Sequence, residues 1–172
     1  MQRKNIDPLV ILGSSRSHGN TRQAVHEVLQ DSHIPIIDLK TLQIAPYDYA
    51  YANAHDDFMP LAEKMMQYNP LILATPVYWY TMSALMKTFI DRWSDLVRIR
   101  KDLGRRLAGK DLFIISSYGD SIPRGFEDAF IQTCTYLDMC YQGCYYFYSG
   151  EDVAVVQENT TLAKKFAARI FA

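Results

Sequence analysis

The sequence has no charge bias, no membrane-length apolar run and few cysteines, and each absence excludes a class of protein. Its 172 residues include 18 Lys and Arg against 19 Asp and Glu, a formal net charge of -1. A nucleic-acid partner favours a basic surface, so this balance argues against one. No stretch approaches the roughly 20 apolar residues that span a bilayer, so no membrane partner is expected. The remaining composition, 49% hydrophobic and 22% charged, is that of an ordinary globular domain.

The three cysteines are odd in number and unevenly spaced, at Cys134, Cys140 and Cys144. Neither a disulfide framework nor a paired C-x-x-C metal site follows from this pattern, and no metal site is expected. The simplest interpretation is small buried side chains in a reducing cytosol. The first eight residues lack the apolar centre of a signal peptide, which predicts a cytoplasmic location. A length of 172 residues predicts a single domain, residues 1–172.

Apolar runs of strand length alternate with amphipathic segments along the chain. Strands are predicted over Leu9–Leu12, Ile34–Leu39, Leu71–Thr75, Leu112–Ser116 and Cys140–Tyr148. Helices are predicted after Asn20, over Phe58–Tyr68, Ser83–Val97 and Gly125–Leu137, and in a last segment that buries Leu162, Ala163, Phe166, Ala167, Ile170 and Phe171. Five strands alternating with five helices predict an α/β fold whose parallel sheet is covered on both faces. In such sheets ligands bind beyond the carboxyl ends of the strands.

The stretch Gly13–Thr21 connects the first strand to the first helix and has the features of a phosphate-binding turn. Asn20, with Gln23 three residues later, resembles a capping box, so the turn ends on a helix N-terminus. Backbone N–H groups there have no intrahelical partners and the helix dipole is positive, which favours a dianionic phosphate. The alternative is an ordinary strand-to-helix turn of small polar residues with no ligand.

The spacing within this turn excludes two other phosphate motifs. A nucleotide-hydrolysing P-loop has four residues between its glycines and then a Lys. Here five residues separate Gly13 from Gly19, and Asn20 stands in place of the Lys. The dinucleotide motif G-x-G-x-x-G is also missing, because positions 15 and 18 are Ser and His. The turn therefore favours a monophosphate.

The loop Pro76–Met82, after the third strand, contains three consecutive aromatic residues, Tyr78, Trp79 and Tyr80. Three large rings are difficult to bury in one short loop, and an aromatic wall suits a planar, partly apolar ligand. Tyr118 adds a ring at another strand end. The alternative is that these rings pack under the loop or against a neighbouring subunit.

Two stretches of the chain resemble the flavodoxin-like NADPH-dependent FMN reductase family, the group that includes iron-sulfur flavoproteins and small quinone reductases. They are Gly13-Ser14-Ser15-Arg16 through Gly19-Asn20-Thr21, and Thr75-Pro76-Val77-Tyr78-Trp79-Tyr80 through Asp91-Arg92. The resemblance covers nearly the whole chain. It implies a doubly wound three-layer sandwich whose five-stranded parallel sheet has the order 2-1-3-4-5, with FMN as cofactor and NAD(P)H as co-substrate.

The resemblance also implies which residues bind the cofactor. The FMN phosphate is held by the turn residues Ser14, Arg16, Asn20 and Thr21, together with Gly19. The ribityl chain and isoalloxazine are bordered by Pro76, Val77, Tyr78 and Trp79, and the other ring edge by Ser117, Tyr118 and Gly119. No residue is assigned a catalytic role, because the cofactor supplies the hydride chemistry.

Iron-sulfur relatives carry cysteines after the second strand, but Ala45–Asp57 has none, so no cluster is expected. Three other features leave alternatives open. Tyr47, Tyr49 and Tyr51 in that connection cover the flavin, meet a partner subunit or pack within the loop. Arg16 offsets phosphate charge or is an exposed turn residue. Asp91 and Arg92 either order the helix that carries the aromatic loop or form its wet face.

The expected function is an FMN-containing oxidoreductase that transfers hydride from NAD(P)H to a quinone, flavin or similar acceptor in a ping-pong cycle. A homodimer or tetramer is expected from the resemblance. One alternative is a flavodoxin-type single-electron carrier; such carriers are strongly acidic by resemblance, so a charge of -1 favours the reductase. The other is a binding module of the same fold without flavin.

Overall fold

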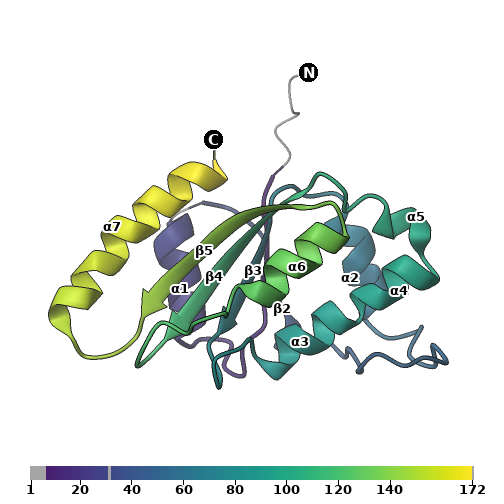
Figure 1. The fold of residues 1–172 in the computed structure, drawn as a ribbon, viewed down its shortest axis with the longest axis horizontal. Coiled ribbons are helices and arrows are strands. Elements are labelled where there is room, and N and C mark those ends of the chain that lie inside the picture. The colour runs from purple at the N-terminus through teal and green to yellow at the C-terminus, as the bar shows by residue number, and fades with distance from the viewer. Residues whose placement is uncertain (1–6, 31, 172) are drawn as a thin grey trace.

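The computed structural model describes residues 7–30 and 32–171 and contains a five-stranded parallel sheet of order β2-β1-β3-β4-β5 (Figure 1). The strands are β1 (Leu9–Leu12), β2 (Ile36–Asp38), β3 (Leu71–Pro76), β4 (Asp111–Tyr118) and β5 (Cys140–Tyr148). The helices are α1 (Asn20–Leu29), α2 (Phe58–Met65), α3 (Ala84–Asp91), α4 (Trp93–Arg98), α5 (Lys101–Gly104), α6 (Asp128–Tyr136) and α7 (Val153–Ile170), with a 3-10 turn, η1, at Leu39–Thr41. This strand order is that of flavodoxin-like proteins and confirms the predicted fold.

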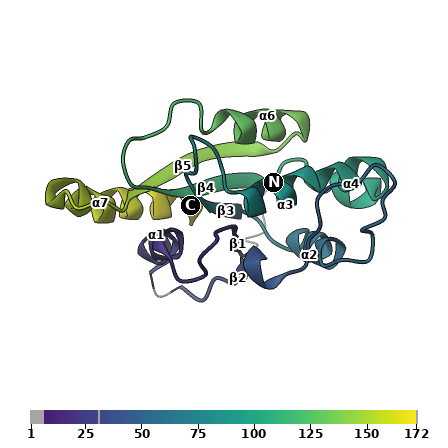
Figure 2. The same cartoon turned by 90° about the horizontal axis from the view of Figure 1, so that it is seen from below.

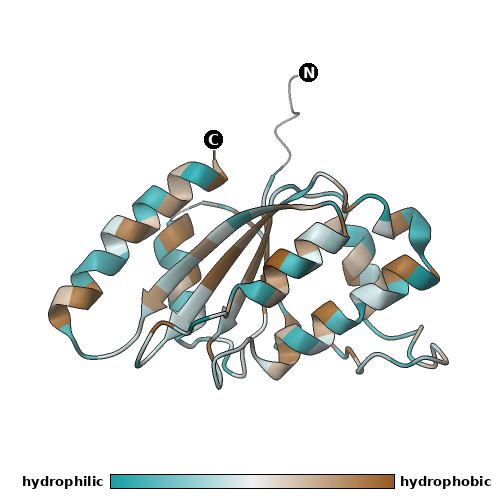
Figure 3. Ribbon diagram, in the orientation of Figure 1, coloured by the Kyte–Doolittle hydropathy of each residue, from teal (hydrophilic) through white to brown (hydrophobic). Residues whose placement is uncertain are grey.

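Helices cover both faces of the sheet. Seen from below, α1 and α7 lie on one side, and α2, α3, α4 and α6 lie on the other (Figure 2). Side chains of a strand alternate between faces, so Phe113 and Ile115 of β4 pack towards α1 and α7, whereas Leu112 and Ile114 pack towards the other helices. Hydrophobic colour is concentrated on the strands between the helices (Figure 3).

Strands β1 and β3 lie in the centre of the sheet, and all their residues are buried. That burial explains their uninterrupted apolar sequences, because both faces of each strand contact helices. β5 is an edge strand, and the side chain of Asn159 in α7 protects part of its free edge. The Asn159 amide accepts a hydrogen bond from Tyr148 N (3.1 Å) and donates one to Tyr148 O (2.8 Å), as a neighbouring strand would.

Several local predictions were wrong. The N-cap of α1 is Gly19 without a side-chain cap, so Asn20 and Gln23 form no capping box. Leu162 and Phe171 are 45% and 52% exposed, because the buried stripe of α7 runs along Ala163, Phe166 and Ile170. The described chain has seven α-helices rather than five, partly because the helix predicted over Ser83–Val97 divides into α3 and α4 at Arg92.

Arg92 is buried between α3 and α4 and fixes the connection between η1 and α2. Its guanidinium donates to Asp95 Oδ2 (2.8 Å), to Ala45 O (3.0 Å) and to the carboxylate of Asp56. It also lies 4.8 Å from the centre of the Phe58 ring. Arg92 therefore orders the structure and is not part of a wet helix face.

Asp91, which immediately precedes Arg92, lies on a solvent-exposed face. Its side chain is 44% exposed and pairs with Lys87 one helical turn earlier. Of the two predicted alternatives, Arg92 therefore fits the ordering role and Asp91 fits the solvent-exposed face. Exposed ion pairs such as that of Asp91 with Lys87 contribute little to stability.

The ion pair of Arg92 with Asp56 predicts an acid-sensitive component of stability. Burial alone raises the pKa of Asp56, but hydrogen bonds from Arg92, Ala45 N and Phe58 N outweigh it and lower this pKa below its ordinary value. A carboxyl whose pKa is depressed on folding stabilises the protein above its unfolded pKa, about 3.9, and loses that stabilisation as pH falls through the folded value. We expect the free energy of unfolding, measured by urea denaturation from about pH 5 to pH 2, to fall less steeply in Asp56→Asn than in the wild type. Asp91→Asn serves as the control, and equal slopes for Asp56→Asn and the wild type would contradict the prediction.

Candidate functional site

The carboxyl ends of β1, β3 and β4 frame a cavity of about 120 Å³. Parallel strands end at the same edge of a sheet, so the loops that follow them converge. The cavity is lined by Ser14, Arg16, Gly19, Asn20, Thr21, Pro76, Val77, Tyr78, Ser117, Tyr118, Gly119 and Ser149. The structure therefore brings together all the predicted site residues except Trp79, and adds Ser149, which the sequence did not indicate.

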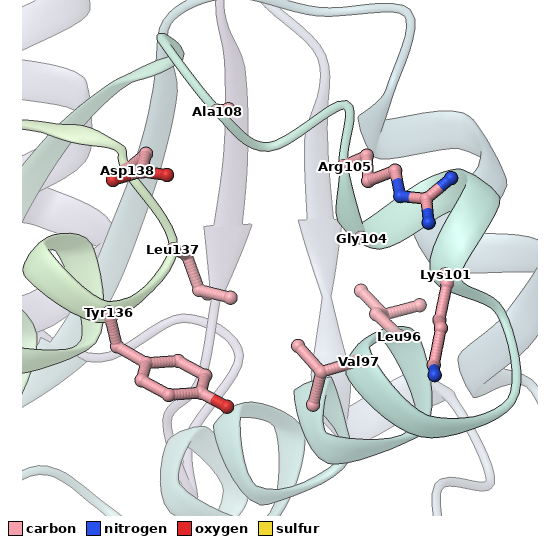
Figure 4. Close-up of a pocket in the computed structure, with 9 residues that line it drawn as sticks. All are labelled: Leu96, Val97, Lys101, Gly104, Arg105, Ala108, Tyr136, Leu137 and Asp138. Atoms are coloured by element: carbon pink, nitrogen blue, oxygen red, sulfur yellow. The ribbon is translucent and has the colours of Figure 1, made fainter.

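A cavity of about 310 Å³ lies elsewhere, between α4, α5 and the end of α6 (Figure 4). The segments that form it lead into the amino ends of β4 and β5, at the opposite edge of the sheet from the predicted residues. Lys101 and Arg105 lie on one side of it, and Tyr136 and Asp138 on the other, so the polar groups around this cavity are not of one chemical kind (Figure 4). We therefore place the candidate site at the carboxyl edge.

Gly13 allows the phosphate turn to pack closely against the start of α3. A Cβ at Gly13 would come within 3.1 Å of the Met86 Cα, a backbone atom that cannot easily give way. The Ser83 hydroxyl caps α3, accepting from Met86 N (3.2 Å), and donates to Gly13 O (2.6 Å). The first turn and the α3 helix are thus fixed to each other beside the cavity.

The helix end at Asn20 and Thr21 presents backbone donors to the cavity. The N-cap Gly19 has no side chain with which to satisfy them, so the positive end of α1 remains suited to an anion. Thr21 is buried, and its hydroxyl lies 2.8 Å from the Ser117 hydroxyl of β4. Ser14 is also buried and accepts from Arg16 N (3.3 Å), while Arg16 itself is exposed. These donors have the chemistry of a phosphate cradle.

Arg22, on α1, connects the turn to the end of β2. Its Nε donates to Ser17 O, and its guanidinium lies 3.6 Å from Asp38 at the end of β2. His18, in the same turn, is exposed. Arg22 was not predicted, because its partners lie in the turn and in another strand.

The aromatic loop after β3 forms a tight, strained turn. Tyr78 N donates to Thr81 O (2.9 Å) and Thr81 N donates to Tyr78 O (3.1 Å). Trp79 and Tyr80 between them have φ angles of 48° and 66°, the left-handed values of a type I′ turn, which favours Asn and Gly. Left-handed backbone costs about 1–2 kcal/mol at each non-glycine residue. Strain of this kind concentrates at ligand sites.

The rings of this turn are exposed, as expected. Trp79 is 92% exposed and lies outside the cavity lining, whereas Tyr78 lines it. The Tyr78 hydroxyl lies 2.8 Å from the Ser15 hydroxyl, which connects the aromatic turn to the phosphate turn. An aromatic surface thus adjoins a helix N-terminus that has no side-chain cap.

Tyr118 forms the wall contributed by β4. Its ring centre lies 6.2 Å from that of Tyr146 and 5.5 Å from that of Tyr148, both on β5. Its carbonyl accepts from Ser149 N (2.8 Å) and Ser149 Oγ (2.9 Å). Burial, and then the neighbouring Tyr148 and Glu158, raise the pKa of Tyr118, so its phenol stays neutral at physiological pH. The only signal for Ser149 in the sequence was its position just after the fifth strand.

Tyr47, Tyr49 and Tyr51 form a separate aromatic cluster. The Tyr47 ring centre lies 5.0 Å from that of Tyr49 and 6.3 Å from that of Tyr51. Tyr49 is 87% exposed, and none of the three lines the cavity. Within one chain these rings pack together in their loop and leave the cavity uncovered.

Within the part of the chain that the structure describes, no helix combines the length and the apolar sequence that a bilayer-spanning segment requires. Across residues 7–30 and 32–171, no group of three or more His, Cys, Asp or Glu side chains is arranged to hold a metal ion.

A parallel sheet of order 2-1-3-4-5, with a strand-to-helix turn and an aromatic turn at its carboxyl edge, defines a flavodoxin-like α/β protein. The sequence model of the family described as NADPH-dependent FMN reductase matches residues 7–154. The chain therefore belongs to the NADPH-dependent FMN reductase family, which confirms the resemblance noted in the sequence.

Two curated relatives agree with this assignment. YwqN of Bacillus subtilis, named as an NAD(P)H-dependent FMN-containing oxidoreductase, is 34% identical over 120 residues, which cover 65% of this chain and 66% of YwqN. An iron-sulfur flavoprotein of Archaeoglobus fulgidus is 29% identical over 94 residues, covering 48% of this chain and 43% of that protein. The chain thus spans less than two thirds of the length of either curated relative.

Solved structures match over nearly the whole chain. The Trp repressor binding protein of Bacillus subtilis has a TM-score of 0.74 and 25% identity, over 96% of this chain and 98% of that one. General stress protein 14 of Treponema denticola, solved in complex with FMN, has a TM-score of 0.66 and 17% identity, over 95% and 97%. At 17% identity the second comparison shows the fold alone.

Proposed function

We propose that the chain is an FMN-dependent NAD(P)H oxidoreductase. The observation that carries this proposal is the convergence of the phosphate turn, Tyr78 and Tyr118 on one cavity at the carboxyl edge of the sheet. The donor chemistry fits FMN, because the helix end at Gly19 has no side-chain cap of its own and hydroxyl groups surround it. When bound, FMN supplies hydride transfer between a nicotinamide and a second substrate.

The residues of this chain bind and orient the cofactor in this proposal. Ser14, Arg16, Gly19, Asn20 and Thr21 would hold its phosphate through backbone and side-chain donors. Pro76, Val77, Tyr78 and Trp79 would border the ribityl chain and ring system, and Ser117, Tyr118 and Gly119 the other ring edge. Backbone N–H groups beside the ring would stabilise negative charge there.

We infer further that the two substrates use the ring side of this cavity in turn, in a ping-pong cycle. The rings of Trp79 and Tyr80 are exposed on the turn that follows Tyr78, a lining residue, and offer surface on which planar molecules stack. The second substrate would accordingly be a quinone, a free flavin or another small aromatic acceptor.

The visible absorption spectrum of the purified protein, recorded before and after anaerobic NADPH, tests this proposal. We expect a flavin spectrum, its loss on addition of NADPH, and its return when a quinone is added. Free FMN with NADPH under the same conditions is the control. Bound flavin that NADPH cannot reduce would indicate a single-electron carrier. Absence of FMN binding in a titration would reject both flavin functions.

A further inference from the structure

Glu127 lies just before α6 and joins two tyrosines of β5. Its Oε2 accepts from the Tyr141 hydroxyl at 2.5 Å, and its Oε1 accepts from the Tyr146 hydroxyl at 3.0 Å. Hydrogen bonds to a carboxylate are about twice as strong as those between neutral groups. One side chain thus holds two rings of the edge strand, 14 and 19 residues away in sequence.

Both tyrosines remain donors in this arrangement. Burial, foremost, and the hydrogen bond to Glu127 raise the pKa of Tyr141. Burial, with the neighbouring Cys144 and Glu127, likewise raises the pKa of Tyr146. The two phenols are therefore protonated at physiological pH, and each O–H points to one carboxylate oxygen.

The two tyrosines differ in what their rings contact. The Tyr146 ring meets Tyr118, with centres 6.2 Å apart, and Phe126, with centres 5.9 Å apart. Among the described residues, Tyr141 has no ring contact with Tyr118. Tyr118 lines the candidate site and Glu127 does not, so the ring of Tyr146 connects the carboxylate to a lining residue.

We propose that Glu127 is a positioning residue for the candidate site, and that its hydrogen bond to Tyr146 holds the ring of Tyr118, a residue that lines the cavity. This inference rests on the proposed function, because it assigns the wall of the FMN site to Tyr118. Glu127 touches neither the cofactor nor the substrates.

A second ring supports the same wall independently of Glu127. Tyr148 contacts Tyr118 and folds over Gly150, where a Cβ would come within 2.2 Å of the phenol oxygen. Tyr118 therefore rests on two rings, of which Glu127 fixes only Tyr146. Loss of the carboxylate should displace Tyr118 in part and weaken FMN binding without abolishing it.

The experiment compares Tyr146→Phe with Tyr141→Phe. Each variant removes one hydroxyl from the same carboxylate, so both lose comparable stability, but only the first loosens a ring that contacts Tyr118. We expect Tyr146→Phe and Glu127→Ala to weaken FMN binding by the apoprotein about fivefold to tenfold. The residual fluorescence of bound FMN should rise in both, since an adjacent phenol ring quenches it. Tyr141→Phe should stay within about twofold of wild type in affinity.

Glu127→Gln adds a conservative rescue. Its amide oxygen still accepts from one hydroxyl and its NH₂ group donates to the other, so most of the affinity and quenching should return. Equal FMN affinity and fluorescence in Tyr146→Phe and Tyr141→Phe would overturn the inference alone, provided that the wild type binds FMN. A wild-type protein that binds no FMN would overturn the proposed function and this inference with it.

Discussion

Asn20→Asp is expected to weaken FMN binding on the order of 100-fold while leaving the apoprotein as stable as the wild type or slightly more so. Asn20 is the first residue of α1 and lines the cavity. A carboxylate there interacts favourably with the helix dipole, worth about 0.3–1 kcal/mol. The same carboxylate repels a bound phosphate, by up to about 4 kcal/mol per pair of unit charges at 4 Å near a protein surface. Stability and affinity therefore change in opposite directions, which general damage to the fold would not produce.

Fluorescence titration of the apoprotein with FMN, alongside its thermal unfolding, measures both quantities. Val153→Asp is the matched control, because it places the same charge at the first residue of α7, outside the cavity lining. It should leave FMN affinity unchanged. Equal affinities for Asn20→Asp and wild type would show that the phosphate does not bind at this turn.

Thr21→Ala is best kept separate from that variant. The Thr21 hydroxyl is buried against the Ser117 hydroxyl, so its removal leaves a buried group of β4 without this partner. A loss of affinity in a double variant with Asn20→Asp would mix charge repulsion with a structural change.

The strands of the sheet could be predicted from the sequence because burial on both faces leaves an apolar run with no polar interruption. Leu9–Leu12 and the first five residues of β3 match the predicted strands. The edge strand was harder in principle, yet weak alternation over Cys140–Tyr148 predicted it correctly. Strand order followed from the resemblance alone, whereas the alternation of strands and helices predicted only a parallel sheet covered on both faces.

The site could be predicted to the extent that the strand topology of the sheet determines which loops lie side by side. Once Gly13–Thr21, Pro76–Met82 and the end of β4 are assigned to parallel strands, their convergence at one edge follows. Ser149 and Glu127 were missed, because neither belongs to a sequence motif and contacts between distant parts of the chain determine their roles. The left-handed conformation of Trp79 was also missed, since no sequence rule favours an aromatic residue there.

The division of the helix at Arg92 shows the same limit in the fold. Helical spacing predicted Ser83–Val97 as one element, and of its apolar residues Met86, Phe89, Trp93 and Leu96 are buried, while Leu85 and Ile90 are half-buried. A charged residue next to this stripe reads from sequence as solvent-exposed. Its burial depends on Asp56, 36 residues earlier, and on backbone carbonyls of the loop between η1 and α2.

Arg92→Met is expected to lower the free energy of unfolding by about 3–5 kcal/mol, because it keeps only the unbranched stem of the side chain and leaves its two carboxylate partners without a cation. Asp56 and Asp95 are only 13% and 4% exposed, so water cannot replace the guanidinium. For a protein of this size the melting temperature should fall by about 6–20 °C. Urea denaturation and thermal unfolding measure the change, and Asp91→Ala, at the neighbouring exposed position, should stay within about 0.5 kcal/mol of wild type.

A triple variant separates the unpaired charges from the lost packing against Phe58. Arg92→Met with Asp56→Asn and Asp95→Asn removes all three charges, and replacing a whole buried ionic group costs less than removing one partner. We therefore expect the triple variant to be more stable than Arg92→Met alone, although it carries two more substitutions. If the triple variant is less stable, Arg92 stabilises the protein through its contact with the ring and the loop carbonyls rather than through charge.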